Sequence, residues 1–198
     1  MEIIRQVKNI DMVKILKNTG SIMEGHFKLT SGFHSKYYMQ CAMLLQYPVV
    51  VYGIIGDALQ EFGNEINSEN IQAVISPAIG GILFGYMLAF KLNTKMIFTE
   101  RKNDLMELRR GFEISAGEKV IIAEDVITTG GSVFEVIEIC KKFKADIKGI
   151  ISIVDRSENL EFEYPFYSLI KLKIEKYPPD NCPLCKQNLA IDYPGSRK

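Results

Sequence analysis

The sequence has no excess of charge of either sign, because 24 basic residues balance 24 acidic residues. The chain as a whole therefore lacks the positive balance that is typical of a protein with a nucleic-acid partner. Internal repeats and low-complexity tracts are also missing. A chain of 198 residues suits one domain with a core of its own. We expect a single domain over residues 1–198 that binds no nucleic acid.

The N-terminus lacks the uninterrupted apolar core of a signal peptide, because charged residues interrupt positions 1–20. Residues 73–90 carry no charge, and their length approaches the roughly 20 residues of a membrane span. Pro77 and the pair Gly80 and Gly81 interrupt this stretch, which predicts a strand, a loop and a helix instead. With few cysteines as well, the sequence predicts a cytoplasmic protein without a membrane partner.

Two common nucleotide-binding motifs are missing. The chain contains neither a GxxxxGK[ST] phosphate loop nor a GxGxxG after a strand, so we expect neither a kinase nor a dinucleotide-dependent dehydrogenase. Histidine is scarce, since His26 and His34 are the only two. Both stand in a polar segment, where a histidine is more often a hydrogen-bonding partner than a catalyst. We leave both outside the predicted catalytic set.

Helices and strands are predicted to alternate along the chain. Apolar spacing predicts helices over residues 3–16, 48–66, 82–90 and 132–144, strands over 71–75, 95–99, 119–123 and 147–154, a charged segment over 100–110, and two extended pieces with a turn at 31–32 over 25–40. This order indicates an α/β fold with a parallel, doubly wound sheet flanked by helices. Ligands of such a sheet lie beyond the carboxyl ends of its strands. We expect residues 46–158 to form this core and residues 1–45, with part of 160–198, to form a small hood.

The segment from Val120 to Ser132 carries the most informative chemistry. It reads VIIAEDVITTGGS, in which an apolar strand ends in Glu124 and Asp125 and a turn of small residues leads into a helix. Unpaired N–H groups at a helix N-terminus suit a phosphate. The two acids suit sugar hydroxyls or a bound magnesium ion. Taken singly, a solvated acid pair and an N-cap turn explain each half without a ligand, but together they predict a ribose phosphate site.

In this order the residues resemble the phosphoribosyl pyrophosphate (PRPP) signature of type I phosphoribosyltransferases. Residues 25–40, GHFKLTSGFHSKYYMQ, are similar to the segment that lines the base pocket of the orotate enzymes, and purine enzymes lack this string. Residues 76–81 resemble the loop that holds pyrophosphate. Residues 98–112 resemble the mobile loop of bacterial orotate enzymes. The resemblance covers nearly the whole chain.

The resemblance implies an enzyme that transfers the ribose 5-phosphate group of PRPP to orotate and releases pyrophosphate, as in pyrimidine biosynthesis. It also implies a homodimer in which the loop 101–110 completes the neighbouring site. The implied cofactor is Mg²⁺, which would arrive with PRPP, so no residue is assigned as its direct ligand. Positive charge develops on the ribose in this reaction, so electrostatic stabilisation is expected to dominate.

The resemblance also implies the site residues. The implied catalytic residues are Glu124, Asp125, Arg101 and Lys102. The implied PRPP-binding residues are Arg101, Lys102, Arg109, Arg110, Glu124, Asp125, Val126, Ile127, Thr128, Thr129, Gly130, Gly131 and Ser132, and the implied orotate-binding residues are Thr128, Arg156, Tyr38 and Met39. Arg156 follows a predicted strand, and its guanidinium suits bidentate binding of the orotate carboxylate.

Five residues in three places depart from the family pattern. Many orotate enzymes carry lysine where Thr30 stands, tyrosine and lysine where Ile79 and Gly80 stand, and glycine and lysine where Asp104 and Leu105 stand. The cation that meets pyrophosphate must therefore come from elsewhere, and the basic segment is the obvious source. Within it, Lys102, Arg109 and Arg110 are equal candidates, although such runs are often merely solvated.

Cys182 and Cys185 form a single CxxC. A tetrahedral zinc site needs four ligands, and the sequence offers no second CxxC and no neighbouring histidine, which favours a structural or incidental role.

Two other functions stay open. A phosphoribosyltransferase for purines would share the donor chemistry, but residues 25–40 and Arg156 argue against it. A non-catalytic regulator that senses PRPP would need a basic face or an added DNA-binding segment, and the neutral charge gives little support.

Overall fold

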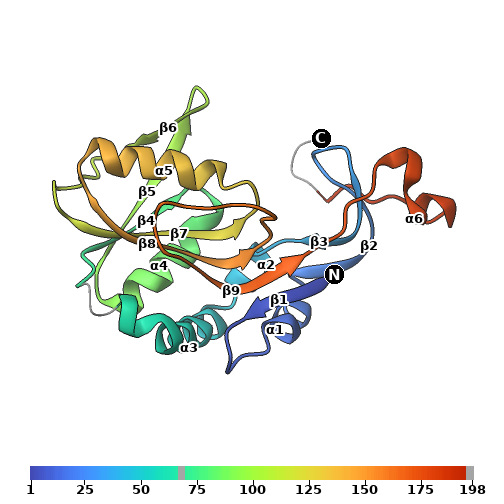
Figure 1. Cartoon of the computed structure of the whole chain (residues 1–198), viewed down its shortest axis with the longest axis horizontal. Coiled ribbons are helices and arrows are strands. Elements are labelled where there is room, and N and C mark those ends of the chain that lie inside the picture. The colour runs from blue at the N-terminus through green and yellow to red at the C-terminus, as the bar shows by residue number, and fades with distance from the viewer. Residues whose placement is uncertain (67–69, 195–198) are drawn as a thin grey trace.

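The computed structural model describes residues 1–66 and 70–194. Among these residues, a seven-stranded sheet runs in the order β1-β9-β8-β7-β4-β5-β6 (Figure 1). Its strands are β1 (Glu2–Gln6), β4 (Ala73–Pro77), β5 (Lys95–Lys102), β6 (Leu105–Leu108), β7 (Lys119–Ile127), β8 (Asp146–Asp155) and β9 (Phe166–Lys173). The inner strands are parallel and the two edge strands are antiparallel. Residues 67–69 of the predicted polar run and 195–198 of the tail lie outside the described residues.

Helices cover both faces of the sheet, as the alternating pattern predicts. α3 (Pro48–Ile66) and α4 (Gly80–Leu92) lie on one face and α5 (Gly131–Lys142) lies on the other (Figure 1). Successive strand residues point to opposite faces, so Val74 packs in the core beneath α3 and α4, whereas Ala73 and Ile75 pack in the core beneath α5. The predicted fold class is confirmed, with a mostly parallel sheet that is covered by helices on both faces.

The strand order reverses between β4 and β7. From β4 the chain passes through α4 to β5 on one side, whereas β7 leads to β8 and then β9 on the other side. Loops that leave two such strands in opposite directions open a crevice at their carboxyl ends. Residues 78–81 after β4 and 128–132 after β7 flank this point, so the fold brings two of the predicted ligand-binding segments together.

The prediction of one helix over residues 3–16 is wrong in its first part. Residues 2–6 form β1, which pairs antiparallel with β9, and the helix α1 spans Met12–Asn18. Asp11 caps this helix, because its carboxylate accepts a hydrogen bond from the backbone N–H of Lys14 at 3.0 Å. Val7 and Leu16 enter the same core, so apolar spacing alone could not separate the strand from the helix.

The charged segment 100–110 forms a hairpin. β5 continues to Lys102, and β6 returns antiparallel to it after Asn103 and Asp104. Both turn residues have positive φ angles, of 50° and 63°, a conformation that asparagine and aspartate tolerate in two-residue hairpin turns. The hairpin projects beyond α5 (Figure 1), so this segment is regular structure that the sequence reading missed.

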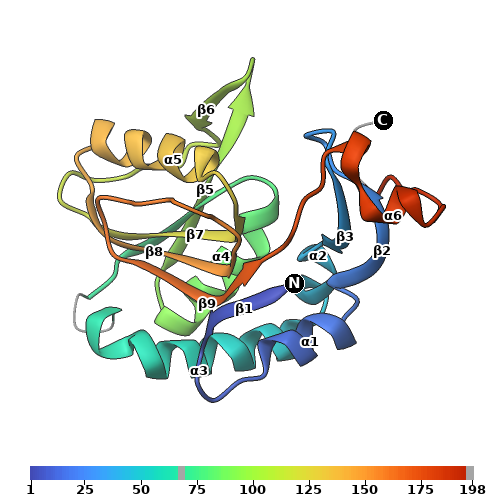
Figure 2. The ribbon, with the colours of Figure 1, turned by 45° about the vertical axis from the view of Figure 1, so that its right-hand side comes forward.

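A second, two-stranded sheet forms a cap at one end of the molecule (Figure 2). Its elements are β2 (Ile22–Lys28) and β3 (His34–Met39), followed by the short α2 (Ala42–Leu45), and it contacts the C-terminal segment with the 3-10 helix η2 (Pro179–Asn181) and α6 (Pro183–Lys186). This agrees with the two extended pieces predicted over 25–40, and Gly32 in the turn has a φ of 83°. β1, in contrast, joins the main sheet.

The uncharged stretch 73–90 is divided between β4 and α4. Within residues 1–66 and 70–194, no helix has the length and apolar character that crossing a membrane requires. Residues 73–77 of this stretch are uncharged because β4 is fully buried between the two helical layers.

Candidate active site

A cavity of about 250 Å³ opens at the carboxyl end of β7. Its lining comes from one hairpin residue, one acid and the turn into α5, namely Arg101, Glu124, Val126, Ile127, Thr128, Thr129, Gly130, Gly131, Ser132 and Val133. Gly130 occupies the N-cap of α5 with a φ of 75°, and no side chain of the described residues caps the helix. The first N–H groups of α5 are therefore available to an anion, which the helix dipole also favours.

Gly130 is required by its surroundings as well as by its φ angle. A Cβ atom at this position would lie 2.9 Å from Leu160 and 3.2 Å from Phe134. The backbone can therefore turn tightly here and present its N–H groups to the cavity.

Glu124 lines this cavity, and Asp125 follows it on β7. Glu124 is 9% exposed, and its Oε1 accepts a hydrogen bond from the backbone N–H of Asp125 at 3.0 Å. Asp125 Oδ1 accepts one from the N–H of Val126 at 2.9 Å. Burial, and then the charge of Asp125, raise the pKa of Glu124 to about 9. These causes favour the protonated form of Glu124, and the pair suits hydroxyl groups or a cation.

The loop after β4 approaches the acids closely. A Cβ atom on Gly80 would lie 2.6 Å from Asp125 Oδ1, and one on Gly81 would lie 2.9 Å from the carbonyl oxygen of Ala123. Only glycine fits at these two positions without a shift of the acids. This gives a physical reason for glycine at position 80, since a lysine there would meet the carboxylate of Asp125.

Arg156 stands beside the same turn. Its backbone N–H donates to the carbonyl oxygen of Ile127 at 2.8 Å, so the guanidinium leaves β8 next to the end of β7. Burial lowers the pKa of Arg156, while Cys41 and Tyr38 act in the opposite direction. Its Nε atom is buried and has no hydrogen-bond partner among the described residues. A buried N–H donor without a partner suits the acceptor of a ligand.

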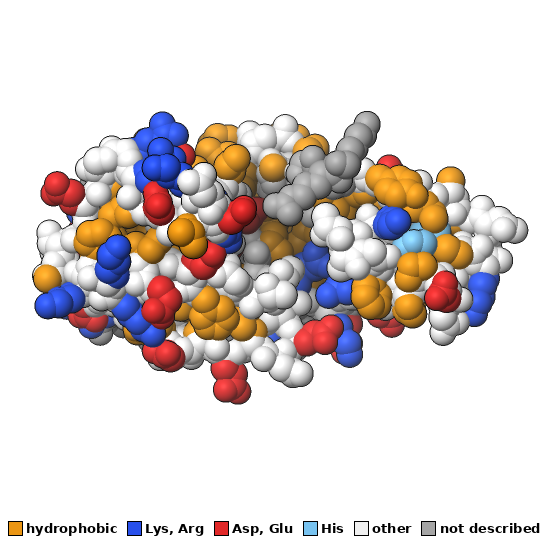
Figure 3. Space-filling model, turned by 90° about the horizontal axis from the view of Figure 1, so that it is seen from above, with side chains coloured by type: hydrophobic (Ala, Val, Ile, Leu, Met, Phe, Trp, Pro, Cys, Tyr) orange, Lys and Arg blue, Asp and Glu red, His pale blue; other side chains and the backbone are white. Residues whose placement is uncertain are grey.

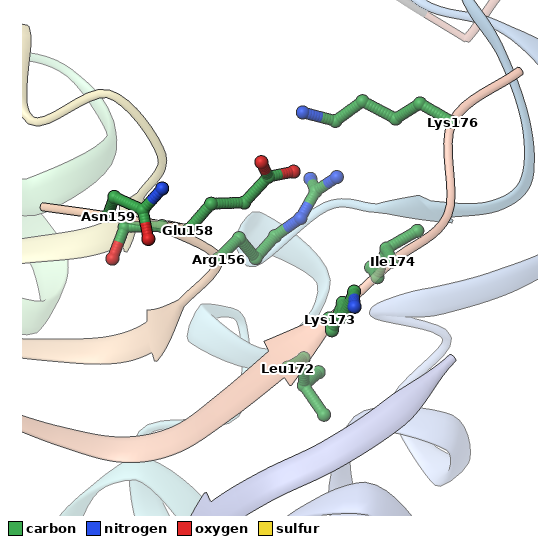
Figure 4. Close-up of a pocket in the computed structure, with 8 residues that line it drawn as sticks. Arg156, Glu158, Asn159, Leu172, Lys173, Ile174 and Lys176 are labelled. Carbon is green, nitrogen blue, oxygen red and sulfur yellow. The ribbon is translucent and has the colours of Figure 1, made fainter.

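A second cavity, of about 310 Å³, lies next to Arg156. Arg156 and Glu158 reach into it from the segment after β8, and Lys176 faces them from the segment after β9 (Figure 4). The cavity lies between the segment after β8 and the segment that leads from β9 into the cap. It therefore adjoins the cap, which contains the residues expected to line the base pocket.

The turn that carries Arg156 is fixed by its neighbour. Asp155 Oδ1 accepts hydrogen bonds from the N–H of Ser157 at 2.8 Å and from its hydroxyl at 2.6 Å. The other carboxylate oxygen pairs with Lys171 on β9 at 3.0 Å. Sequence reasoning missed this positioning role, although a carboxylate at the end of an apolar strand was a signal for it.

The other residues expected to bind orotate lie in different surroundings in the structure. Thr128 lines the first cavity, and the Tyr38 ring is half-buried with its centroid 5.8 Å from that of Phe27. Met39 is 7% exposed and packs in the hydrophobic core. The side chain of Met39 is therefore part of the core beneath the sheet.

The basic residues of the hairpin differ in placement. Arg101 lines the first cavity, but it is held by Glu135 of α5, with Nη1 2.9 Å from Oε1, and it donates to the carbonyl oxygen of Asp104 at 2.9 Å. Arg110 pairs with Glu100 at 2.7 Å. Lys102 and Arg109 are exposed and do not line the cavity. The partnership of Arg101 with Glu135 was not foreseen, because the two residues are 34 positions apart.

Known proteins share both the sequence and the fold of this chain. Residues 43–180 match the family model described as phosphoribosyl transferase domain. The orotate phosphoribosyltransferase of Caldicellulosiruptor bescii is 46% identical over 187 residues, which cover 94% of this chain and 96% of that protein. The orotate phosphoribosyltransferase of Thermotoga maritima is 46% identical over 189 residues, which cover 94% of this chain and 98% of that protein.

A solved structure gives the same result. The crystal structure of orotate phosphoribosyltransferase from Aeropyrum pernix is similar with a TM-score of 0.70 and 25% identity, covering 81% of this chain and 93% of that chain. With the cavity at the switch point, the acid pair and Arg156 in place, and with these relatives matching almost end to end, the chain belongs to the orotate phosphoribosyltransferase family.

Proposed function

We propose that this chain transfers the ribose 5-phosphate group of PRPP to orotate, giving orotidine 5′-phosphate and pyrophosphate. The observation that carries the proposal is the juxtaposition of three groups at the switch point. These are the uncapped N-terminus of α5 at residues 128–132, the acids Glu124 and Asp125, and the unpartnered Nε of Arg156. They suit, in turn, a phosphate, a ribose and a carboxylate.

PRPP is held from its two ends in this proposal. The 5′-phosphate accepts hydrogen bonds from the N–H groups and hydroxyls of residues 128–132, and the ribose hydroxyls meet Glu124 and Asp125. Burial and the charge of Asp125 favour the protonated form of Glu124 in the free protein, and this form can donate one hydrogen bond and accept another. The pyrophosphate lies toward residues 78–81, where glycines let the backbone come close.

The donor set also fits the Mg²⁺ that typically accompanies PRPP in this family. Mg²⁺ prefers hard ligands such as carboxylate oxygens. The two carboxylate oxygens of Asp125 adjoin the glycine loop 78–81, where there is room for only backbone atoms. When bound, Mg²⁺ offsets negative charge on the pyrophosphate. The chain's own acids orient the ribose hydroxyls at the same time.

Orotate binds through its carboxylate to Arg156, with Tyr38 and Thr128 near the ring. A ring nitrogen forms a bond to the anomeric carbon and releases its proton, while the bond to the pyrophosphate oxygen breaks and its electron pair leaves with pyrophosphate. Asp125 stabilises the positive charge on the ribose. Arg101 meets the leaving group once Glu135 releases it, with Lys102, Arg109 and Arg110 as further candidates.

A homodimer is part of the proposal. An apolar surface on α3 and α4 supports it, because Val49, Tyr52, Leu83, Tyr86 and Phe90 are each at least 42% exposed. We expect sedimentation to give twice the chain mass. Activity restored by mixing Asp125→Asn chains with chains that lack Arg101 and Lys102 would support a hairpin that serves the neighbouring site, and no restoration would oppose it.

A cytoplasmic location accords with the four free cysteines.

An absorbance assay tests the activity. Orotate loses its characteristic ultraviolet absorbance when its ring nitrogen is glycosylated, so wild-type protein with PRPP and Mg²⁺ should consume orotate and release pyrophosphate in equal amounts. Excess chelator should stop the reaction. Binding of PRPP without turnover of any base would contradict the proposal and favour the PRPP-sensing regulator.

A further inference from the structure

Four potential metal ligands that are far apart in the sequence meet inside the cap. His26 comes from β2, His34 from β3, and Cys182 and Cys185 from the start of α6. One donor atom of each lies within 4.8 Å of the other three. The histidines and the cysteines are more than 140 residues apart in the sequence. The lone CxxC therefore gave no sign of its histidine partners.

The distances between the donor atoms fit one tetrahedral ion. Zn–N bonds of about 2.0 Å and Zn–S bonds of about 2.3 Å place neighbouring ligand atoms roughly 3.3–3.8 Å apart. His26 Nε2 lies 3.6 Å from Cys182 Sγ and 3.7 Å from Cys185 Sγ. His34 Nδ1 lies 3.3 Å from Cys185 Sγ and 3.0 Å from His26 Nε2. The shortest distance is within a few tenths of an ångström of the expected range.

A hydrogen bond behind the cluster orients its first histidine. His26 Nδ1 lies 2.8 Å from the carbonyl oxygen of Leu189. A carbonyl oxygen can only accept, so Nδ1 carries the proton and Nε2 directs its lone pair at the cluster. Metal-binding histidines almost always have such a partner on the other ring nitrogen.

Burial separates this cluster from an ordinary surface pair of cysteines. His26, His34 and Cys182 are 3%, 4% and 1% exposed. In the space-filling view a small area of histidine lies among hydrophobic side chains over the cap (Figure 3). Buried imidazole and thiol groups need partners, and in this structure the four groups contact one another. A metal ion would satisfy all four at once.

Ile22 and Met39 anchor the base of the cap in the main core, but the part of the cap that meets the C-terminal segment has little apolar core of its own. β2 and β3 join the C-terminal segment through backbone hydrogen bonds, such as His34 N–H to the Tyr177 carbonyl oxygen at 2.8 Å and Asp192 N–H to the His26 carbonyl oxygen at 2.7 Å. Phe27 and Leu184 are buried but belong to neither large core. Small units without a sufficient apolar core are commonly stabilised by a structural metal.

We propose that His26 Nε2, His34 Nδ1, Cys182 Sγ and Cys185 Sγ bind one Zn²⁺ in a structural site that ties the β2–β3 hairpin to the C-terminal segment. Two thiolates and two imidazoles are a common structural zinc set, and the CxxC spacing matches it. Four protein ligands leave no open position for substrate, so the ion stabilises the cap and takes no part in chemistry.

The metal content of the purified chain tests this proposal. Protein made without a histidine tag, reduced and incubated with equimolar Zn²⁺, is desalted and analysed by plasma mass spectrometry. We expect close to one zinc per chain. Cys182→Ser and Cys185→Ser should each lower this to below about a tenth. The matched control is Cys140→Ala, which changes a buried cysteine in the core beneath α5 and should keep the full zinc content.

Cobalt identifies the ligands even where a cysteine variant folds poorly. Wild-type chain loaded with Co²⁺ should show the intense visible bands of tetrahedral cobalt and a thiolate charge-transfer band in the near ultraviolet. Any of three results would overturn the proposal. The first is wild-type protein that holds no zinc after this treatment, and the second is a Cys182–Cys185 disulfide in freshly purified protein. The third is octahedral cobalt without the thiolate band, which would exclude the assigned ligands.

Discussion

Replacement of Arg156 by glutamine tests how the base is held. The backbone of Arg156 is anchored to Ile127 at 2.8 Å, and its Nε is a buried donor without a partner among the described residues. Glutamine is shorter, uncharged and cannot form two parallel bonds to a carboxylate. Loss of one partner from a buried, hydrogen-bonded charge pair costs about 2–5 kcal/mol.

A loss of about 3 kcal/mol corresponds to a fall of roughly 150-fold in kcat/KM for orotate. The affinity for PRPP should stay within about twofold, because the bond broken involves the base alone. Unfolding stability should change by less than about 1 kcal/mol, since the variant removes a desolvated cation whose Nε has no partner in the part of the chain that the structure describes.

Steady-state kinetics with orotate varied at saturating PRPP give the first quantity, and calorimetric titration of PRPP gives the second. Lys14→Gln on α1 is a matched control, because it removes one positive charge from an exposed residue. Wild-type kcat/KM in Arg156→Gln would refute the reasoning, because the guanidinium then cannot be the carboxylate partner. An equal loss of PRPP affinity would refute it too.

Three further predictions concern the acid pair and its loop. Asp125→Asn should lower kcat/KM by at least about 100-fold with little change in melting temperature, and wild-type turnover would exclude its role in stabilising the ribose. The raised pKa of Glu124 means that its neutral form stabilises the fold fully below its ordinary pKa of 4.5, and that this contribution is lost as pH rises toward about 9. Glu124→Gln should therefore raise the stability of the free protein at pH 8 by on the order of 2 kcal/mol and much less at pH 5, and parallel pH profiles in calorimetry would contradict this. Gly80→Ala brings a Cβ within 2.6 Å of Asp125 Oδ1 and should cost about 1–3 kcal/mol of stability. The control is Gly53→Ala in α3, which has open space around it and should stabilise the chain by about 0.5–1 kcal/mol. Equal effects of the two variants in thermal denaturation would show that the contact with Asp125 is absent.

The α/β core was predictable because its signals are local. Strands such as β4 and β7 are continuous apolar runs, and small residues mark the turn into α5. The same holds for Glu124 and Asp125, whose order along the chain already implies a strand end beside a helix start. Parallel strand ends then meet at one edge, which brings Arg156 to the same place.

The features that sequence reasoning missed depend on distant partners. β1 is a strand because β9, more than 160 residues later, offers an open edge. The pairing of Arg101 with Glu135 and the meeting of His26 with Cys185 need the tertiary fold as well. The hairpin at 100–110 was missed because the end of β5 is charged and β6 is only four residues long, so neither piece shows the alternation that identifies a half-buried strand.

Comparison of bases tests the central claim most directly. Uracil is orotate without the carboxylate, so the pair isolates the contribution of Arg156, and adenine, guanine and xanthine test the purine alternative. With PRPP and Mg²⁺ in excess, we expect kcat/KM for orotate to exceed that for uracil by at least about 1000-fold, with no measurable turnover of purines. Turnover of adenine, guanine or xanthine without turnover of orotate would contradict the account.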